Sequence, residues 1–392
     1  MSKDVQRPGW GDARRIVVKI GSRVLVQRTG RPDRRRMREL VRQLADLRAE
    51  GRQVVVVSSG AIASGMEALG LKKRPKDVAG LQMAAAVGQS RLMAAYDELF
   101  GARGCRIGQV LLTHDDLKHR GRHLNARTTM MALLEHGIVP IVNENDVVAV
   151  EEIKFGDNDL LASLVAMLVE ADALILLTTV DGLRAPAGTG RTRRVARLEG
   201  VTAEALGLAH GKGSELSTGG MLSKLQSAGM VVASGIPVVI ANGRTDGVIE
   251  AVVAGRDTGT LIVPGGPVPA GLQSHRKRWI AFFHKTPGSL VIDDGARDAL
   301  LCRGRSLLPI GVKAVEGTFG AGAVVNIKTA EGAVVARGQV AYGSADIERV
   351  RGHKTADIAQ VLGHDGAAEV VHRDNLVVLA EQSGDAETAD NE

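Results

Sequence analysis

Two lysines in widely separated segments are suited to binding a phosphoryl group. Lys19 ends a short apolar run and is followed by Gly21, where the missing side chain lets a ligand approach the backbone closely. Lys224 directly follows Ser217-Thr-Gly-Gly-Met-Leu-Ser223, in which two glycines precede an expected helix. A lysine supplies a compact positive charge, and unpaired N–H groups where a helix begins attract anions. Either lysine alone could be an ordinary solvated side chain, so the hypothesis requires the fold to bring them together.

Two clusters of Asn and Asp residues are the next candidates. Asn143-Glu-Asn-Asp146 follows an apolar run, and Gly156-Asp-Asn-Asp159 precedes another. Carboxylate and amide oxygens can hold an ammonium group or a metal ion, and the same residue types are also common in turns. Because both clusters flank apolar segments, a site for a polar ligand is as well supported as a pair of turns.

Two further segments place hydroxyl-bearing residues directly after an apolar run. Ser59 lies in Ser58-Ser-Gly-Ala-Ile-Ala-Ser-Gly65, and its hydroxyl could donate to an anion or cap a helix. Thr178-Thr-Val-Asp-Gly182 could bind a nucleotide or form a tight turn at its end. Neither segment decides the chemistry by itself.

Composition and missing motifs exclude several classes of protein. The 392 residues are 44% hydrophobic, enough for a large core, yet no apolar run approaches the roughly 18 residues of a membrane span. GxxxxGK[ST], GxSxG and HExxH do not occur, and no GxGxxG follows the first apolar run, so these nucleotide, hydrolase and zinc sites are not predicted. Two distant cysteines predict neither disulfides nor zinc binding, and a reducing cytoplasm is expected. The net charge of +6 suits an anionic ligand or an ordinary surface, and 2% aromatic residues argue against a stacking platform for nucleic acid.

The rest of the sequence indicates the fold that must position these residues. Short runs rich in Val and Ile, typical of strands buried on both faces, alternate with stretches that repeat apolar residues every three to four positions. Strands are predicted at 15–20, 54–58, 107–112, 138–142, 173–178 and 237–241. Helices are predicted at about 33–51, 82–100, 124–136, 159–169 and 220–234, with Asp33 capping the first. This alternation predicts an α/β fold, a three-layer α/β/α sandwich around a largely parallel sheet.

The pattern changes after residue 265, where GGPVPAG marks a linker rich in Pro and Gly. Beyond it, short Val- and Ile-rich runs separated by glycines predict a small, mostly β domain. We therefore divide the chain into an N-terminal tail (1–13), an α/β domain (14–265), a linker (266–275), a β-rich domain (276–375) and an acidic, disordered tail (376–392). Ligands bind at the carboxyl ends of parallel strands, so the candidate site belongs to the α/β domain.

Taken together, these segments resemble the amino acid kinase family, and within it the members that phosphorylate glutamate. The match rests on motifs in the same order and spacing: VVKIGS (17–22), VVVVSSGAIASG (54–65), AAVGQSRL (85–92), LLTHDD (111–116), NARTT (125–129), PIVNENDVVA (140–149), IKFGDNDLLA (153–162) and STGGMLSK (217–224). RKRWI (276–280), SLLPIGVKAVEG (306–317) and VHRDN (371–375) resemble the PUA domain that many bacterial members carry. The resemblance covers about residues 14–375.

The resemblance implies ATP-dependent phosphorylation of the γ-carboxylate of L-glutamate to L-glutamyl 5-phosphate, the first step of proline biosynthesis, with Mg²⁺ as cofactor. It implies catalytic roles for Lys19, Lys224 and Asp159, with Asp159 orienting the two lysines. The implied glutamate-binding residues are Ser59, Gly60, Asn143, Asp146, Asp157 and Asn158. The implied ATP-binding residues are Lys19, Thr178, Thr179, Thr218, Gly219, Gly220, Met221, Leu222, Ser223 and Lys224. The family also implies a homo-oligomer (dimer or tetramer) and inhibition by L-proline. No membrane association is expected, because the sequence has no apolar run long enough to span a bilayer.

Two departures and two alternatives accompany this interpretation. Thr179 and Arg184 stand where family members commonly have Asp and Tyr, so contacts on the adenine side are expected to differ. Within the family, the alternative is a related kinase that acts on another carboxylate or on UMP. Outside it, the alternative is RNA binding through the C-terminal domain, where three basic residues at 276–278 precede Trp279, although the basic excess there is weak.

Overall fold

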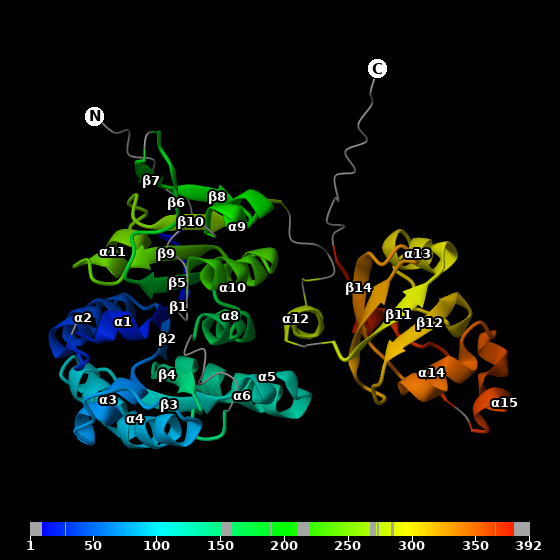
Figure 1. Cartoon of the computed structure of the whole chain (residues 1–392), viewed down its shortest axis with the longest axis horizontal. Helices are drawn as coiled ribbons and strands as arrows, with labels where there is room; N and C mark the ends of the chain where they lie inside the picture. Colours follow the sequence, from blue (N-terminus) through cyan, green and yellow to red (C-terminus); the bar gives the residue numbers. More distant parts are fainter. Residues whose placement is uncertain are drawn as a thin grey trace. The chain divides into compact units, whose positions relative to one another are not determined.

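A computed structural model of the chain describes residues 10–27, 29–149, 158–188, 190–209, 220–266, 272, 274–283, 286–364 and 366–379. The chain divides into two compact units, Met1–Pro267 and Val268–Glu392 (Figure 1). Each unit has its own sheet and its own buried apolar core, as separate domains do.

The large sheet of the first unit has eight strands among the described residues. In spatial order they are β3 (Ile107–Leu112), β4 (Val139–Glu144), β2 (Gln53–Ser58), β1 (Arg15–Ile20), β5 (Ala173–Thr178), β9 (Val238–Asn242), β10 (Thr260–Val263) and β8 (Arg197–Glu199). The first six run parallel, whereas β10 is antiparallel to β9 and parallel to β8. The carboxyl ends of six strands therefore share one edge, where ligands bind in open α/β sheets.

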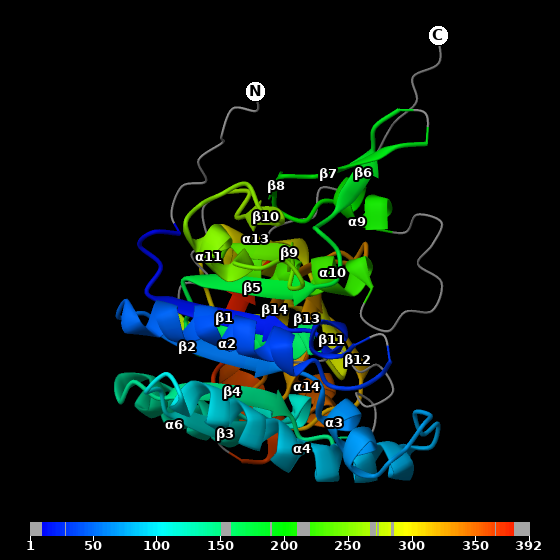
Figure 2. The ribbon, with the colours of Figure 1, turned by 90° about the vertical axis from the view of Figure 1, so that its left-hand side faces the viewer.

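Helices cover both faces of this sheet. They are α1 (Ser22–Leu25), α2 (Arg34–Ala49), α3 (Ala61–Ala68), α4 (Val78–Gly101), α5 (His114–Lys118), α6 (Arg120–Glu135), α8 (Asp159–Leu168), α9 (Ala203–Ala209), α10 (Met221–Ala233) and α11 (Val248–Val253). In Figure 1, α2 and α11 lie on one side of the sheet and α8 and α10 on the other, and Figure 2 looks onto the α2 and α11 side. The predicted three-layer sandwich is confirmed. Across the described residues, no helix combines the length and apolar character that crossing a bilayer requires.

Strand β1 shows how the sheet separates its two faces. Side chains of a strand point alternately to opposite faces. Ile16, Val18 and Ile20 are buried in an apolar core together with residues of α2, α4 and α11. Lys19 therefore points to the opposite face, which α8 and α10 cover. A charge buried on an otherwise apolar strand requires a partner on that face.

The structure confirms the predicted elements and adds others. All six predicted strands are present, and Asp33 caps α2 by accepting a hydrogen bond from the Arg36 N–H at 3.0 Å. Four short strands were not predicted: β6 (Arg184–Pro186), β7 (Thr192–Arg194), β8 and β10. The first three have three residues each (RAP, TRR and RLE), so no apolar pattern marks them. β6 and β7 pair as a separate antiparallel hairpin.

The second unit is built on a five-stranded sheet, counted over its described residues. The order is β12 (Val312–Gly317), β11 (Gly288–Ile292), β13 (Val324–Lys328), β14 (Val334–Gln339) and β15 (Leu376–Val378). β11 and β13 are parallel, and the other neighbours are antiparallel. Its helices are α12 (His275–Phe282), α13 (Asp294–Leu301), α14 (Ser344–Val350) and α15 (Ile358–Leu362), with short 3₁₀ turns at Pro309–Gly311, Thr355–Asp357 and Arg373–Asn375. The predicted small, strand-rich domain is confirmed.

Strand β15 corrects one predicted boundary. Leu376–Val378 pairs antiparallel with β14, and Leu376 and Val377 are buried. Residues 376–378 therefore complete the second sheet and are not part of a disordered tail. The apolar triplet LVV directly precedes the acidic C-terminal residues, so composition alone does not separate it from them. Residues 380–392 lie outside the described residues.

Helices α3 and α4 cross at two glycines. A Cβ atom on Gly65 would lie 1.7 Å from the Ala84 carbonyl oxygen, and one on Gly88 would lie 1.7 Å from the Ala61 carbonyl oxygen. Both distances are far inside van der Waals contact, so only glycine allows the two backbones to approach this closely. The crossing bears on the candidate site because α3 begins directly after Ser58-Ser-Gly.

We predict that Gly88→Ala lowers the free energy of unfolding by about 2 kcal/mol or more, because the added methyl group forces α3 and α4 apart. Urea denaturation followed by circular dichroism measures this change. Gly101→Ala, in the same helix, is the matched control, since a Cβ there meets nothing within 4 Å. Equal loss of stability in the two variants would contradict the tight crossing.

Candidate active site

Lys19, Asp159 and Lys224 meet in the interior of the first unit. Lys19 Nζ lies 2.5 Å from Asp159 Oδ1, and Lys224 Nζ lies 2.8 Å from Asp159 Oδ2. All three side chains are buried, and Asp159 has an exposure of 0%. One carboxylate thus bridges two ammonium groups that come from distant parts of the sequence.

Three elements place these side chains. Lys19 is the penultimate residue of β1, Asp159 is the first residue of α8, and Lys224 lies in the first turn of α10. α8 and α10 pack against each other, and Ser163 Oγ of α8 donates to the Ser227 carbonyl oxygen of α10 at 3.0 Å. A carboxylate at the start of a helix is favoured by the helix dipole, so Asp159 is well placed on α8.

The electrostatics of this group suit an anionic ligand. Two ammonium groups and one carboxylate give the trio a net positive charge in a largely buried setting. Electrostatic interactions are stronger where water is excluded, and fixed donors there need no reorganisation when charge develops on a ligand. The arrangement can therefore hold and polarise a phosphoryl group at the carboxyl edge of the sheet.

Asn158, next to Asp159, is tied to the ends of two strands. Its Nδ2 donates to the Ser58 carbonyl oxygen at 2.7 Å and to Asn143 Oδ1 at 2.8 Å. Asn143 lies near the end of β4 and donates in turn to Gln89 Oε1 of α4 at 2.8 Å. The structure thus brings the two Asn- and Asp-rich clusters together. Because Nδ2 of Asn158 is occupied, its side-chain carbonyl oxygen is the group left to accept from a ligand.

Ser59, Gly60 and Gly21 shape the backbone beside Lys19. Ser59 is buried, and Gly60 has φ = +112°, a left-handed conformation that glycine adopts without strain as the chain enters α3. The Gly21 N–H donates to the Leu177 carbonyl oxygen at 3.1 Å. A Cβ atom on Gly21 would lie 3.2 Å from that oxygen and 3.7 Å from Lys19 Nζ, so glycine keeps the space next to the lysine open.

Asp146 lies in the turn after β4, three residues beyond Asn143. Burial raises the pKa of its carboxyl group to about 6, and the positive charge of Arg74 acts in the opposite direction. The charge of Asp146 therefore changes just below neutral pH. Any ligand that depends on this carboxylate will bind in a pH-dependent way.

Apart from Lys19, the described residues that are predicted to bind ATP lie where β5 ends and α10 begins. Thr178 ends β5, and Thr179 follows it. Gly220 caps α10, whose first turn holds Met221, Leu222, Ser223 and Lys224. Three predicted site residues lie outside the described residues: Asp157, Thr218 and Gly219. A glycine-capped helix start beside a lysine offers N–H donors and positive charge to a phosphate.

Arg184, one of the two departures from the family pattern, is engaged within the β6–β7 hairpin. Its Nη1 donates to the two Asp181 carboxylate oxygens at 2.9 and 2.7 Å, and its Nε donates to Thr192 Oγ1 at 2.9 Å. The guanidinium therefore holds the two strands of the hairpin together.

Two residues of α4 support the site and were not predicted. Gln89 accepts the hydrogen bond from Asn143, and Tyr96 Oη lies 2.8 Å from Ser58 Oγ. Burial raises the pKa of Tyr96 well above its usual range, so this side chain stays neutral. Gln89 occurs in AAVGQSRL, one of the segments that resemble the family, but a glutamine on a helix gives no chemical signal alone.

The structure weakens the RNA-binding alternative. The aromatic residue on which it relied, Trp279, lies in α12 and is only 3% exposed. RNA bases stack on exposed aromatic rings, so a buried ring cannot serve this purpose. The neighbouring basic residues lack the aromatic partner that the sequence suggested.

Comparison with known proteins agrees with the fold. Residues 14–242 match the amino acid kinase family, and residues 288–362 match the PUA domain. The glutamate 5-kinase of Myxococcus xanthus is 50% identical, with 95% of this chain and 98% of that protein covered. Those of Moorella thermoacetica and Geobacter sulfurreducens are 47% and 45% identical, covering 95% and 93% of this chain and 98% of each relative. The chain belongs to the amino acid kinase family, and within that family to the glutamate 5-kinases.

We predict that Asp159→Asn lowers the free energy of unfolding at pH 7 by about 3 kcal/mol, because two buried ammonium groups then lose their shared carboxylate. Chemical denaturation at neutral pH measures the loss. Adding Lys224→Met to this variant removes one of the two cations and should recover part of the stability. A single Asp159→Asn variant as stable as the parent would show that the ion pairs contribute nothing.

Proposed function

We propose that this chain transfers the terminal phosphoryl group of ATP to the γ-carboxylate of L-glutamate, giving L-glutamyl 5-phosphate in the first step of proline biosynthesis. The observation that carries the proposal is the pairing of Lys19 and Lys224 on Asp159 at the carboxyl edge of the sheet. Phosphoryl transfer depends mainly on positioning and on charge stabilisation, and this trio offers both. The relatives with 45–50% identity select glutamate as the acceptor.

The two reacting groups are both anions and repel each other. At about 4 Å and an effective dielectric constant near 20, two unit charges interact with roughly 4 kcal/mol. Lys19 and Lys224, fixed by Asp159, offset this repulsion and stabilise the charge on the transferring oxygens. The γ-carboxylate is ionised at neutral pH, so the reaction requires no general base.

The α-ammonium group of glutamate needs hydrogen-bond acceptors or negative charge, and its α-carboxylate needs hydrogen-bond donors. Its α-ammonium group is assigned to the carboxylate of Asp146 and the side-chain carbonyl of Asn158. Its α-carboxylate is assigned to the Ser59 hydroxyl and to N–H groups near Gly60, where α3 begins. Asn143 supports this arrangement by holding Asn158 at 2.8 Å, and we keep the predicted contribution of Asp157 as part of the proposal.

ATP is the phosphoryl donor. We assign its phosphates to residues 218–224 and Lys19, and its nucleoside to the end of β5 at Thr178 and Thr179. Mg²⁺ is proposed as its companion, with phosphate oxygens and water supplying most of the ligands, as is usual for this ion. Within the described ranges, no group of three or more His, Cys, Asp or Glu side chains is placed to hold a metal ion, so we assign no protein ligand.

Regulation, assembly and location are proposed from the family resemblance. L-Proline shares the α-carboxylate and charged amine of glutamate, so it suits the groups around Asp146 as a feedback inhibitor. A homo-oligomer, dimer or tetramer, is expected. Cys105 and Cys302 are free thiols, which suits a cytoplasmic location. We assign catalysis to residues 14–265 and regard residues 276–375, extended to β15, as an appended PUA domain.

A panel of acceptors tests the proposed activity. The purified chain is incubated with Mg-ATP and L-glutamate, L-aspartate, N-acetyl-L-glutamate or UMP, with ADP release coupled to a spectrophotometric assay. Hydroxylamine traps the acyl phosphate as a hydroxamate. We expect ADP and hydroxamate to form together with L-glutamate, and faster turnover with another acceptor would overturn the assignment.

In the same assay, Lys224→Ala is expected to lower kcat at least about a hundredfold, a loss of roughly 2.7 kcal/mol in transition-state stabilisation. Lys313→Ala, at an exposed lysine of the second unit, is the control and should retain the kcat of the parent. Near-normal kcat in Lys224→Ala would exclude this lysine from the transfer step.

The pKa of about 6 at Asp146 predicts how glutamate binding responds to pH. Above pH 6 the carboxylate is charged and attracts the α-ammonium group, and below pH 6 it is protonated and the attraction is lost. KM for glutamate should therefore rise as the pH falls from 7.5 to 5.5, with a smaller effect on kcat. Asp146→Asn should show a high KM at every pH, and a variant that keeps the pH dependence of the parent would assign it to another group.

A further inference from the structure

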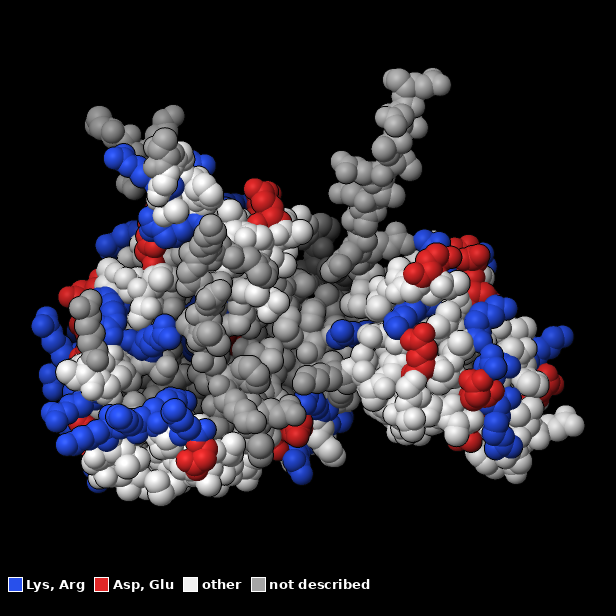
Figure 3. Space-filling view, in the orientation of Figure 1, with Lys and Arg blue, Asp and Glu red and all other residues white. Residues whose placement is uncertain are grey.

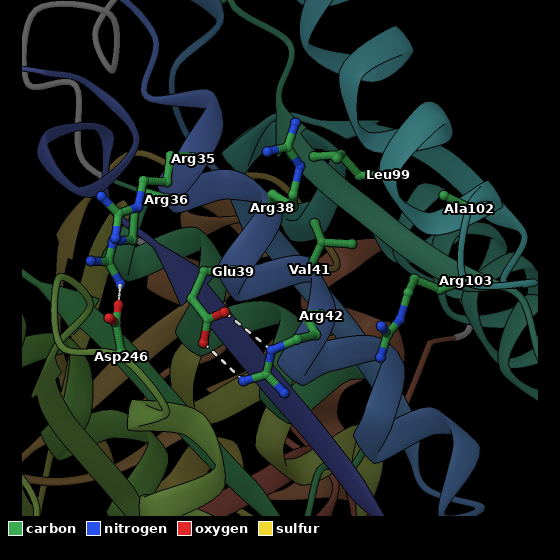
Figure 4. A pocket seen from close by; sticks show the side chains of 10 residues that line it. All are labelled: Arg35, Arg36, Arg38, Glu39, Val41, Arg42, Leu99, Ala102, Arg103 and Asp246. Atoms are coloured by element: carbon green, nitrogen blue, oxygen red, sulfur yellow. Dashed lines mark hydrogen bonds and ion pairs between the residues drawn. The ribbon is translucent and has the colours of Figure 1, made fainter.

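A basic hollow lies between α2 and the end of α4, on the helical layer that faces away from α8 and α10. Its volume is about 380 Å³, within the range of small-molecule sites. Ten residues line it: Arg35, Arg36, Arg38, Glu39, Val41, Arg42, Leu99, Ala102, Arg103 and Asp246. None of them belongs to the candidate active site. Figure 4 shows the arginines of α2 on one side and Arg103, beyond α4, on the other.

The hollow has an excess of positive charge. Five arginines and two acidic residues line it. Figure 3 shows Lys and Arg side chains gathered on this side of the first unit, over α2 and its surroundings. Guanidinium groups remain charged at any physiological pH, so the repulsion between them persists wherever no carboxylate pairs with them.

The positions of the arginines along α2 add to this electrostatic repulsion. The first turn of α2 contains three arginines and no acidic residue, although the N-terminal end of a helix disfavours cations. Arg35, Arg38 and Arg42 are spaced by three and four residues, which puts them on one face of the helix. Sequences tend to break such local rules where a function requires it.

The ion pairs around the hollow leave two guanidinium groups available. Arg36 pairs with Asp246 at 2.8 Å, and Arg42 pairs with Glu39 at 2.8 Å. Arg42 also contacts the carboxylates of Asp46 and Glu250, and Arg103 pairs with Asp46. Arg35 and Arg38 are exposed, and among the described residues no carboxylate pairs with either of them.

We propose that this hollow is a second anion site, separate from the active site, that binds a chain of two or more phosphate groups. Guanidinium groups donate paired hydrogen bonds that match phosphate oxygens. Arg35 and Arg38 supply the free donors, and Arg42 and Arg103 border the same space. A single phosphate is too small to contact all of these groups at once, whereas a polyphosphate chain can extend between α2 and α4.

The source of the phosphate chain can be a nucleotide or an inorganic polyphosphate. Leu99 and Ala102 give the hollow an apolar portion beside its arginines, whereas Val41 is almost fully buried beneath it. A nucleobase would bury part of its surface there, and an inorganic chain would not. The relative affinities of the two therefore identify the source.

Titration calorimetry on the full-length chain tests the site. No nucleotide analogue is added, because its triphosphate could fill the hollow, and Mg²⁺ is left out because it chelates triphosphate. Inorganic triphosphate is expected to bind once per chain, with an affinity that falls as salt is raised. The double variant Arg35→Gln/Arg38→Gln should bind it about a hundredfold more weakly, about tenfold for each lost guanidinium. Its kcat and KM without triphosphate should equal those of the parent.

Arg303→Gln/Arg305→Gln removes two exposed arginines from the second unit and is the matched control, expected to bind like the parent. Inorganic monophosphate should bind at least about tenfold more weakly than triphosphate. Three results would overturn the proposal. Triphosphate does not bind the parent, or it binds Arg35→Gln/Arg38→Gln as tightly as the parent, or monophosphate binds as tightly as triphosphate. GTP that binds about tenfold more tightly than triphosphate would identify a nucleotide as the source, and equal affinities would identify an inorganic chain.

Discussion

The two bonds from Lys19 and Lys224 to one buried carboxylate are the interaction on which the rest of the first unit depends. A charged group inside a protein is tolerated only with compensation, and here a single aspartate compensates two cations. For the three side chains to meet, β1 must lie within the sheet, α8 must begin at its edge and α10 must pack against α8. The topology of the sheet therefore determines which three residues meet, and the need to pair their buried charges favours that topology.

The same edge also holds a network of buried amide side chains that hydrogen-bond to one another and to the ends of the strands. Asn158 links the ends of β2 and β4 through its hydrogen bonds to Ser58 and Asn143. Gln89 of α4 extends the network by accepting a hydrogen bond from Asn143. The close crossing at Gly65 and Gly88 fixes α3 against α4, which places the start of α3 relative to that network. Rigid helices, rather than loops alone, thus position the side chains of this network.

The sequence predicts the large elements because their apolar periods are strong, and the paired motifs because their residue types imply polar ligands. Asp33, for example, is predicted to cap a helix because it is an aspartate directly before a helical pattern of apolar residues. The hairpin of β6 and β7 is not visible, because its polar triplets owe their conformation to cross-strand pairing such as Arg184 with Thr192. Gln89 and Tyr96 escape prediction for a similar reason. Their roles arise only when α4 packs behind β2 and β4, a contact between residues far apart in sequence.

The edge of the second sheet depends on strand β15, near the C-terminal end of the chain. Leu376–Val378 covers the outer side of β14, whose backbone donors and acceptors would otherwise face solvent. An uncovered strand of this kind is a template for pairing with other molecules. Trimming the protein at residue 375, as the acidic composition of its end invites, would therefore replace a three-residue edge strand with the six-residue edge of β14 and make aggregation easier.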